Sequence, residues 1–241
     1  MIQETLGDSP PDSKNTNIKI IIVTSVLAEK MALLDGLGQP TSVDVEVVGV
    51  GSISAAIETT KLLSKQKYDL VICAGIAGGF ENHTSIGDLV ISDQVIAADL
   101  GAQSPEKFLS LEELELGKTR FSTTSDFVQS LKIIFQSKIN QTITGTILTL
   151  STVTGTKTTA QHLTDRYPMA VAEAMEGFGV ASVADSFSVP FVEIRAISNL
   201  VGPRDKSKWR FKEAFSQLKK VGMVLKEISK ETNHLQKEAD K

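Results

Sequence analysis

Apolar and polar positions along this chain follow two periods, one typical of strands and one of helices. Continuous runs of β-branched residues, such as IKIIIVTS at 18–25, indicate strands that are buried on both faces. Apolar residues at helical spacing, as in 52–67, indicate amphipathic helices. The predicted strands are 18–25, 42–51, 68–80, 86–102, 142–156 and 190–201. The predicted helices are 26–38, 52–67, 125–135, 156–167, 172–188 and 207–233.

Local signals refine these boundaries. We predict Ser52 as an N-cap, because its hydroxyl can accept a hydrogen bond from a free amide in the first turn. The strand at 68–80 is expected to run into a glycine-rich turn, and 103–118 is expected to be a loop with a short helix. The alternation of strands and helices predicts an α/β fold with a mostly parallel or mixed sheet covered by helices.

The domain organisation follows from the length and from the two ends. A chain of 241 residues without repeats or an internal linker suits one α/β domain, which we predict over 18–233. The polar stretch 1–17 has neither an apolar core nor an Arg-rich amphipathic pattern, so we predict a disordered leader and no targeting signal. Residues 234–241 are predicted to be a flexible tail.

Composition limits the classes of partner and cofactor that we expect for this chain. A net charge of −4 gives no basic surface, so nucleic acid is not expected as a partner. No apolar run approaches the roughly 20 residues of a membrane span, so no membrane is expected either. The single Cys73 cannot form an internal disulfide, which suits a reducing cytoplasm, and within DLVICAG it is favoured as a buried hydrophobe over a nucleophile. Three scattered histidines make no metal-ligand pattern, so neither metal nor cofactor is predicted.

Candidate chemistry gathers where predicted strands end. Ligands of open α/β sheets bind beyond the carboxyl ends of the strands. Glu29 and Glu176 lie a few residues into helices that follow such ends. We therefore expect one site assembled from five segments. These segments are Thr24–Ser25, Gly49–Gly51, Gly75–Gly79, Ser151–Thr154 and Ser198–Asn199.

Each candidate also has a structural interpretation. AGIAGG (74–79) is compatible with a cradle for a phosphate or nucleoside, and equally with a tight turn. Glu29, on position alone, is favoured as a solvated helix residue. Glu176 lies among apolar residues, where a carboxylate would be buried and would need partners, while the neighbouring Met175 could be core filler. Arg195, inside an apolar strand, could be the structural charge partner of a buried acid.

Taken together, these segments indicate a protein family far more specifically than any one of them does alone. GVGS (49–52), AGIAGG, AMEG (174–177) and RAISN (195–199) together resemble the nucleosidase branch of the nucleoside phosphorylase superfamily, whose bacterial members cleave methylthioadenosine and adenosylhomocysteine. The resemblance covers roughly residues 18–215. It implies a single-domain, three-layer α/β/α fold with a mixed, partly barrel-like central sheet.

One position departs from that branch, because Asn199 stands where those nucleosidases have an Asp. With QVIAADLGAQSPEKFLSLEEL (94–114) and SNLVGPRDKSKW (198–209), the chain resembles the futalosine hydrolases of menaquinone biosynthesis. These enzymes cleave futalosine to hypoxanthine and dehypoxanthine futalosine. The resemblance implies an N-glycosidase that takes a small nucleoside, and a homodimer with 94–114 near the neighbouring site.

The resemblance also implies residue roles. Glu29 would activate water, and Glu176 would hold the ribose hydroxyls, with Met175 packed below the sugar. Trp209 would offer an aromatic lid, or else packs on the core as a helix residue. Arg204 is a candidate partner for the carboxylate of the substrate's benzoate tail, with a solvated loop charge as the alternative. The further predicted substrate contacts are Ser25, Val50, Ile76, Ala77, Gly78, Val153, Thr154, Arg195 and Ser198.

Asn199 is predicted to select the base. Its NH₂ can donate to the 6-oxo group of hypoxanthine, while its carbonyl accepts from N7–H of the leaving purine. Because an amide supplies no acidic proton, the proton on N7 is expected to come by way of water. The structural alternative for Asn199 is a turn residue at the end of a strand.

Three other functions remain open at this point. A purine nucleoside phosphorylase would need a phosphate site, but this chain has no Arg before Arg120, and Glu29 would repel phosphate. A nucleosidase for 6-aminopurines is disfavoured by Asn199. A non-catalytic nucleoside-binding protein of the same fold is disfavoured by the presence of both Glu29 and Glu176.

Overall fold

The computed structural model describes residues 18–38 and 42–239, with side chains up to Ser229. The predicted leader 1–17 lies outside these residues. The strands are β1 Ile20–Thr24, β2 Val43–Val47, β3 Leu70–Gly79, β4 Leu89–Ala97, β5 Gly101–Gln103, β6 Phe108–Ser110, β7 Arg120–Ser122, β8 Thr142–Thr149, β9 Ala170–Ala174 and β10 Phe191–Leu200. The helices are α1 Leu27–Leu37, α2 Ser52–Lys65, α3 Asp126–Lys138, α4 Lys157–Arg166, α5 Gly177–Ser186, a 3₁₀ turn Lys206–Lys208 and α6 Phe211–Ala239.

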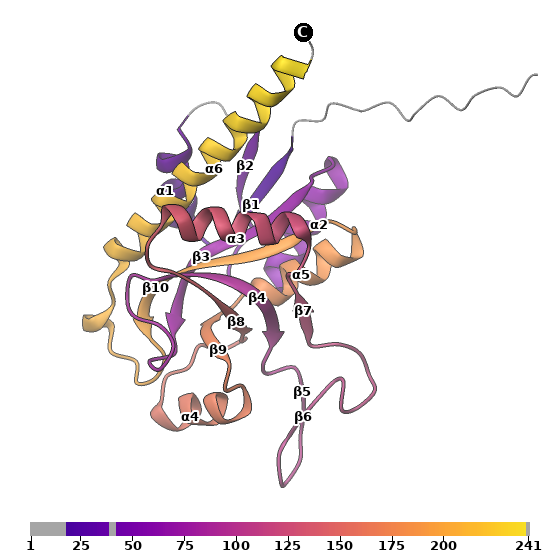
Figure 1. The fold of residues 1–241 in the computed structure, drawn as a ribbon. Helices are drawn as coiled ribbons and strands as arrows, with labels where there is room; N and C mark the ends of the chain where they lie inside the picture. The colour runs from indigo at the N-terminus through magenta and orange to yellow at the C-terminus, as the bar shows by residue number, and fades with distance from the viewer. Residues whose placement is uncertain (1–17, 39–41, 240–241) are drawn as a thin grey trace, which may run out of the picture.

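The central sheet is mixed and partly closed (Figure 1). The strands run in the order β10-β4-β8-β9-β3-β1-β2, and β10 also pairs with β3. These pairings join β10, β4, β8, β9 and β3 into a closed ring of five strands, from which β1 and β2 extend as an open wing. The β10–β3 pairing is parallel, whereas β3–β9 and β10–β4 are antiparallel. The predicted mixed, partly barrel-like sheet is confirmed.

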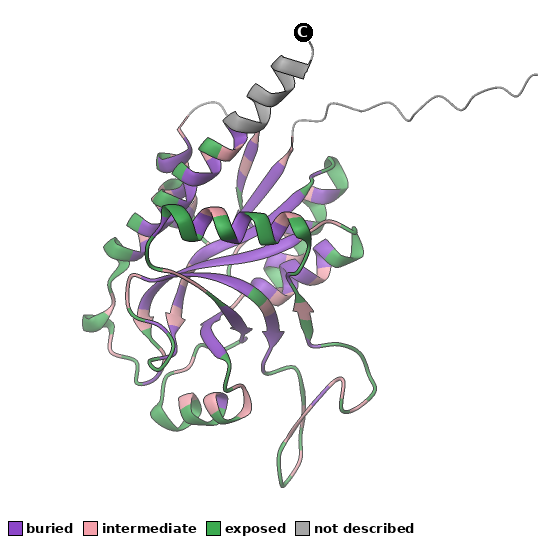
Figure 2. Cartoon of the chain, viewed as in Figure 1, coloured by how far each residue is buried: buried purple, intermediate pink, exposed green. Residues whose placement is uncertain are grey.

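Helices cover both faces of this sheet. Leu33 of α1, Phe135 of α3 and Leu218 of α6 share one buried apolar cluster with the strands. Ala55 of α2 and Val180 of α5 belong to a second cluster on the opposite face. Figure 2 shows the strands buried between helices whose outer faces are exposed. The expected three-layer arrangement is therefore present.

The helix predicted over 172–188 is wrong in its first part. Residues Ala170–Ala174 form the strand β9, and the helix α5 begins only at Gly177. The sequence AVAEA is buried along its whole length, because β9 pairs with β8 on one side and with β3 on the other. Small apolar residues fit a closely packed strand as well as a helix, so their pattern alone did not distinguish the two.

The short helix expected within 103–118 is absent. The segment folds as the β5–β6 hairpin followed by turns, which projects away from the sheet (Figure 1). Glu115 and Gly117 adopt φ of 56° and 148°, and these left-handed values interrupt any helix. The Glu112 side chain accepts hydrogen bonds from the amide and hydroxyl of Thr119, which ties the turns after β6 to the residue that precedes β7.

Three smaller boundaries also differ. Gly51, and not Ser52, occupies the N-cap of α2, with φ of 89°. The terminal helix α6 begins at Phe211 and continues to Ala239, into the predicted tail.

Within the described residues, no helix has the length and apolarity needed to cross a membrane.

Candidate active site

Glu29 is buried, although its position favoured a solvated residue. It lies at the third position of α1, and only 3% of its surface is exposed. One carboxylate oxygen accepts hydrogen bonds from the amides of Ser25 (2.9 Å) and Val26 (3.2 Å), and the other accepts from the amide of Ile76 (2.9 Å). Burial raises the pKa of Glu29, while the Arg195 charge and the amides of Ile76 and Val26 act in the opposite direction. The result is a fixed carboxylate of increased basicity.

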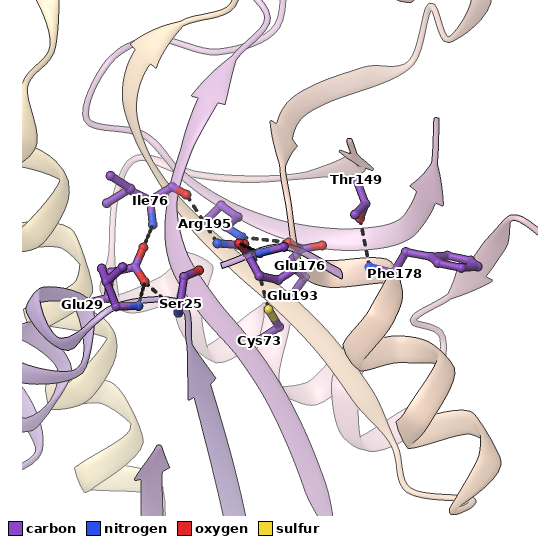
Figure 3. A network of polar contacts seen from close by, with 11 residues as sticks. Ser25, Glu29, Cys73, Ile76, Thr149, Glu176, Phe178, Glu193 and Arg195 are labelled. Carbon is purple, nitrogen blue, oxygen red and sulfur yellow. Dashed lines mark hydrogen bonds and ion pairs between the residues drawn. The ribbon is translucent and has the colours of Figure 1, made fainter. Parts of the chain in front are cut away.

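A second buried acid lies at the start of α5. Glu176 occupies the N-cap position of that helix and accepts a hydrogen bond from the amide of Gly51 at 3.0 Å. The first turn of α5 is held in turn by Thr149 Oγ1, which accepts from the amide of Phe178 at 2.9 Å (Figure 3). The sequence prediction that Glu176 lies inside a helix is therefore wrong. It occupies the N-cap position, and its side chain makes no capping hydrogen bond to α5.

Arg195 joins the buried acids (Figure 3). Its side chain is 1% exposed and forms ion pairs with Glu176 at 3.0 Å and with Glu193 at 2.7 Å. The guanidinium also donates to the carbonyl of Ile76 and to Cys73 Sγ. These contacts agree with the structural interpretation of Arg195 as the charge partner of buried acids. We call Glu29, Glu176, Glu193 and Arg195 the carboxylate cluster.

Two glycines leave room for this cluster. A Cβ on Gly75 would lie 2.5 Å from Arg195 Nη1 and 2.6 Å from Glu29 Oε1. A Cβ on Gly177 would lie 1.9 Å from Glu193 Oε2, an oxygen without a hydrogen-bond partner in the described structure. Burial raises the pKa of Glu193, and the Arg195 charge opposes that shift. The glycines of the motifs therefore make space for side chains at these two points.

Cys73 agrees with its interpretation as a buried hydrophobe. It is buried as a free cysteine under Arg195, and burial raises the pKa of its thiol. Among the described residues, no group of three or more His, Cys, Asp or Glu side chains is arranged to hold a metal ion.

A cavity of about 130 Å³ opens beside the carboxylate cluster. Ile76 belongs to both, because its amide and carbonyl bind Glu29 and Arg195 while the residue lines the cavity. We call this space the Asn199 cavity. The predicted site residues that line it are Ile76, Ala77, Gly78, Val153, Thr154, Ser198, Asn199, Arg204 and Trp209.

The glycine-rich stretch 74–79 forms no turn and no helix start. It continues β3 as far as Gly79, paired with β10 on one side and with β9 at its end. The stretch is therefore strand, and its Ile76 amide donates to Glu29, so a phosphate cradle at a helix N-terminus is not formed here.

Asn199 reaches the cavity through an irregularity in β10. The β10–β3 register advances from Ile197–Ala77 to Asn199–Gly78, so Ser198 is an extra residue in β10. Such a bulge turns the following side chain to the opposite face. The Asn199 carbonyl oxygen accepts from Ser198 Oγ at 2.8 Å, and its amide donates to the carbonyl of Leu200 at 3.1 Å. One amide hydrogen and one oxygen lone pair stay available to a ligand.

Trp209 and Arg204 form the outer wall of the cavity. The Arg204 guanidinium lies 5.3 Å from the centre of the Trp209 ring, and Trp209 packs edge-on against Phe211. Trp209 follows the 3₁₀ turn and is only partly buried, so it is not a helix residue packed in the core. Arg204 is exposed.

Three predicted residues lie beside the cluster and do not line the cavity. Ser25 contributes the amide that holds Glu29. Val50 is exposed next to Gly51, whose amide binds Glu176. Met175 is half-buried between β9 and α5, next to Glu176.

Sequence reasoning missed Glu173. This carboxylate is 5% exposed and lines the Asn199 cavity. Its two oxygens accept hydrogen bonds from the amide (2.9 Å) and the hydroxyl (2.5 Å) of Thr154. Burial raises its pKa, and the Thr154 donors oppose that shift. The signal was the acid inside the apolar run AVAEA, which the helical assignment of 172–188 concealed.

Comparison with known proteins agrees with this geometry. Residues 38–231 match the family model described as the phosphorylase superfamily. A futalosine hydrolase of Streptomyces coelicolor is 42% identical over 74% of this chain and 76% of its own length. That of Acidothermus cellulolyticus is 41% identical over 84% of this chain and 88% of its own. This chain belongs to the futalosine hydrolase family of the phosphorylase superfamily. Among solved structures, this chain is similar to the native structure of futalosine hydrolase of Helicobacter pylori, with a TM-score of 0.74 at 19% identity. The match covers 88% of this chain and 98% of that one, and it shows a shared fold.

Proposed function

We propose that this protein hydrolyses the N-glycosidic bond of futalosine to hypoxanthine and dehypoxanthine futalosine, as a step of menaquinone biosynthesis. Its membership of the futalosine hydrolase family supports this assignment. The observation that carries it in the structure is the Ile76 peptide, which joins the buried base Glu29 to the cavity that contains Asn199. The proposed water-activating group and the proposed base-recognising group therefore lie on either side of one shared residue, Ile76.

Glu29 orients the attacking water and takes its proton. Its carboxylate is held by three amides, so its direction is fixed before substrate arrives. The increased basicity that follows from burial suits proton abstraction near neutral pH. An oxygen that receives one amide hydrogen bond, such as Oε1, keeps a lone pair for the water.

Glu176 stabilises the sugar. Departure of the purine leaves positive charge on the ribose ring, as in other oxocarbenium-like glycosyl transfers. Glu176 is fixed by Gly51 and Arg195, and it holds the ribose hydroxyls and favours the developing cation. Met175 packs below the sugar.

The leaving base lies in the Asn199 cavity. Asn199 donates to the 6-oxo group and accepts from N7–H, and Trp209 covers the base. Arg204, exposed at the same wall, binds the carboxylate of the substrate's tail. Within the side chains described, no acid pairs with the Arg204 guanidinium, which leaves that guanidinium available to a ligand.

We also propose that residues 18–233 act as one domain in the cytoplasm, as a homodimer. Exposed apolar side chains gather on α1, α2 and the segments that precede them, next to the carboxylate cluster. They are Val26, Leu27, Met31, Val47, Val50, Ile53 and Ile57. An apolar surface of this kind, close to a site, suits a partner subunit. The segment 94–114, with its projecting hairpin, lies near the neighbouring site in that dimer.

A substrate panel tests the activity. Futalosine, aminofutalosine, methylthioadenosine and inosine are incubated with the protein, with and without phosphate, and base release is followed by HPLC. We expect phosphate-independent release of hypoxanthine from futalosine. Phosphate-dependent release from inosine would instead indicate a phosphorylase, and faster cleavage of aminofutalosine or methylthioadenosine would indicate a nucleosidase for 6-aminopurines.

The dimer has its own test. Light scattering of the wild type should give twice the mass of one chain, and Ile53→Lys should give a monomer, because the 79% exposed Ile53 side chain is the most exposed of the patch. Ile133→Lys, at a 67% exposed position on α3, serves as the matched control. A monomeric wild type would contradict the homodimer.

A further inference from the structure

We propose that Glu173 is a second base-reading residue, which accepts a hydrogen bond from N1–H of a 6-oxopurine. Glu173 and Asn199 would then recognise the base from two sides. The inference rests on the proposed hydrolysis of a purine nucleoside, and it adds a specificity-determining group to that site.

Strand register places the two side chains in one row. Gly78 of β3 pairs with Glu173 of β9 on one side and with Asn199 of β10 on the other. Register partners on neighbouring strands point to the same face of a sheet. Glu173 and Asn199 therefore face the same space, separated by one strand whose residue there has no side chain.

The space above Gly78 confirms this arrangement. A Cβ on Gly78 would lie 3.4 Å from both Asn199 Nδ2 and Glu173 Cγ, and 3.1 Å from Val201 Cγ2. The Asn199 and Glu173 side chains thus flank the same point, and both line the Asn199 cavity together with Gly78. Glycine at this position leaves a gap between a carboxylate and an amide, into which the edge of a planar ring can enter.

The chemistry of a 6-oxopurine edge matches this gap. O6 stands between N1–H on one side and N7 on the other. An amide on the N7 side can donate to O6 and accept from N7–H, and a carboxylate on the N1 side can accept from N1–H. A 6-aminopurine has a lone pair at N1, which an ionised carboxylate would face without a hydrogen bond.

Thr154 fixes Glu173 as an acceptor. Its amide and hydroxyl each donate to one Glu173 oxygen, which stabilises the ionised form and leaves further lone pairs on both oxygens. Glu173 has no other side-chain partner in the described structure, and it is not needed to balance Arg195, which pairs with Glu176 and Glu193. Thr154, predicted as a substrate contact, is on this view a positioning residue.

Base binding tests the inference without requiring turnover. Affinities of hypoxanthine and 1-methylhypoxanthine are measured by titration calorimetry with the wild type and with Glu173→Ala. We expect the wild type to prefer hypoxanthine by about 10- to 100-fold, since the methyl group removes the N1 donor. Glu173→Ala should reduce this ratio to within a few-fold, because both the acceptor and the obstruction are gone. A wild type that binds both bases equally, or a ratio unchanged in the variant, would overturn the role.

Turnover provides the second readout. In Glu173→Gln the ratio of kcat/KM for futalosine over aminofutalosine should fall about 10- to 100-fold, since an amide can pair with either N1–H or N1. Asp88→Asn, at an acid of similar burial outside the cavity, is the matched control and should keep the wild-type ratio. An equal loss of rate on both substrates would show that Glu173 only supports the fold, and so would overturn the proposal.

These outcomes separate the inference from the proposed function. If the wild type cleaves futalosine and the Glu173 variants keep its preferences, only the role of Glu173 fails. If the wild type cleaves no purine nucleoside, the proposed hydrolysis fails, and the binding ratio still decides whether Glu173 recognises N1–H. Both Glu173 variants could fail to fold, and Thr154 then provides the test. Thr154→Val, compared with Thr154→Ser, should lower the ratio of affinities for hypoxanthine over 1-methylhypoxanthine. An unchanged ratio in Thr154→Val would overturn the proposal.

Discussion

The carboxylate cluster and the Asn199 cavity share the Ile76 peptide, yet their polar groups are satisfied in different ways. In the cluster, Arg195 and Glu193 are 1% and 0% exposed, and ion pairs bind the guanidinium on two sides. In the cavity, Asn199 is partly exposed and keeps hydrogen-bonding capacity for a ligand. Ion pairs and amides therefore fix the cluster in advance, whereas the cavity keeps polar groups that, under the proposed function, would bind the base.

This difference separates stability from specificity. Removing a charge from the cluster leaves another charge buried and unpaired, which costs folding free energy. Removing a polar group from the cavity should cost little stability, because solvent reaches the cavity in the absence of ligand, and should change which base is preferred, because a hydrogen bond to the base is lost.

Glu29→Gln should abolish hydrolysis while substrate binding persists. The amide keeps the shape of the side chain but takes no proton, and loss of a general base typically costs about 10²- to 10⁴-fold in rate. Single-turnover rates and the Kd of futalosine separate the two effects. A rate within a few-fold of the wild type would exclude Glu29 as the base.

The pH dependence sharpens the same assignment. Glu29 must be ionised to act, and burial raises its pKa above the ordinary 4.5. Activity should therefore be present above this raised pKa and fall as the pH drops through it, so that kcat/KM declines at a higher pH than for an ordinary glutamate. A profile that stays flat down to pH 4.5 would contradict this assignment.

Arg195→Met should destabilise the fold by about 3–5 kcal/mol, because it leaves Glu176 and Glu193 buried without their counter-charge. Urea unfolding measures the change. Lys61→Met is the matched control, since the Lys61–Glu58 pair is 58% and 45% exposed and such surface pairs contribute about 0–1 kcal/mol. Equal effects of the two substitutions would remove the distinction between cluster and surface.

Asn199→Asp should leave stability nearly unchanged and move the preference toward 6-aminopurines by about 10-fold or more. A protonated Asp can donate to N7, whereas an ionised one repels O6. The ratio of kcat/KM for futalosine and aminofutalosine, measured across pH, is the readout, and the shift should be greatest at mildly acidic pH. If the ratio does not move, Asn199 does not recognise position 6.

Arg204→Ala should have the smallest effect, a rise in KM of a few-fold to about 10-fold for futalosine, with kcat retained. Under the proposed function, the exposed guanidinium contacts only the carboxylate of the tail, so inosine, which has no such group, should be unaffected. The same increase for inosine would show that Arg204 supports Trp209 and not the tail.

Much of the fold could be predicted because the relevant signals are local. The β-branched runs of β1, β3 and β10 and the helical spacing of α1, α2 and α3 appear in the structure within a few residues of their expected bounds. The failures occur where local signals are ambiguous. In β9, small residues conceal a strand, and in 103–118, helix-forming residues are overridden by left-handed backbone at Glu115 and Gly117.

The candidate site divides in the same way. The sequence supplied Glu29, Glu176, Arg195 and Asn199, because their motifs resemble a family and because strand ends meet at one edge of a sheet. It could not supply the burial of Glu29, since that depends on the Ile76 amide, 47 positions away along the chain.

The sequence alone indicated Glu29, Glu176, Arg195 and Asn199 as candidates for the chemistry, and it predicted that their segments meet where strands end. Only the tertiary structure decided which of them face one another. The closure of β10 onto β3 and the extra residue at Ser198 turn Asn199 toward Gly78, and the pairing of β9 brings Glu173 to the other side of it. The physical reason is that a side chain's face is set by strand register, a long-range property that a single displaced residue reverses.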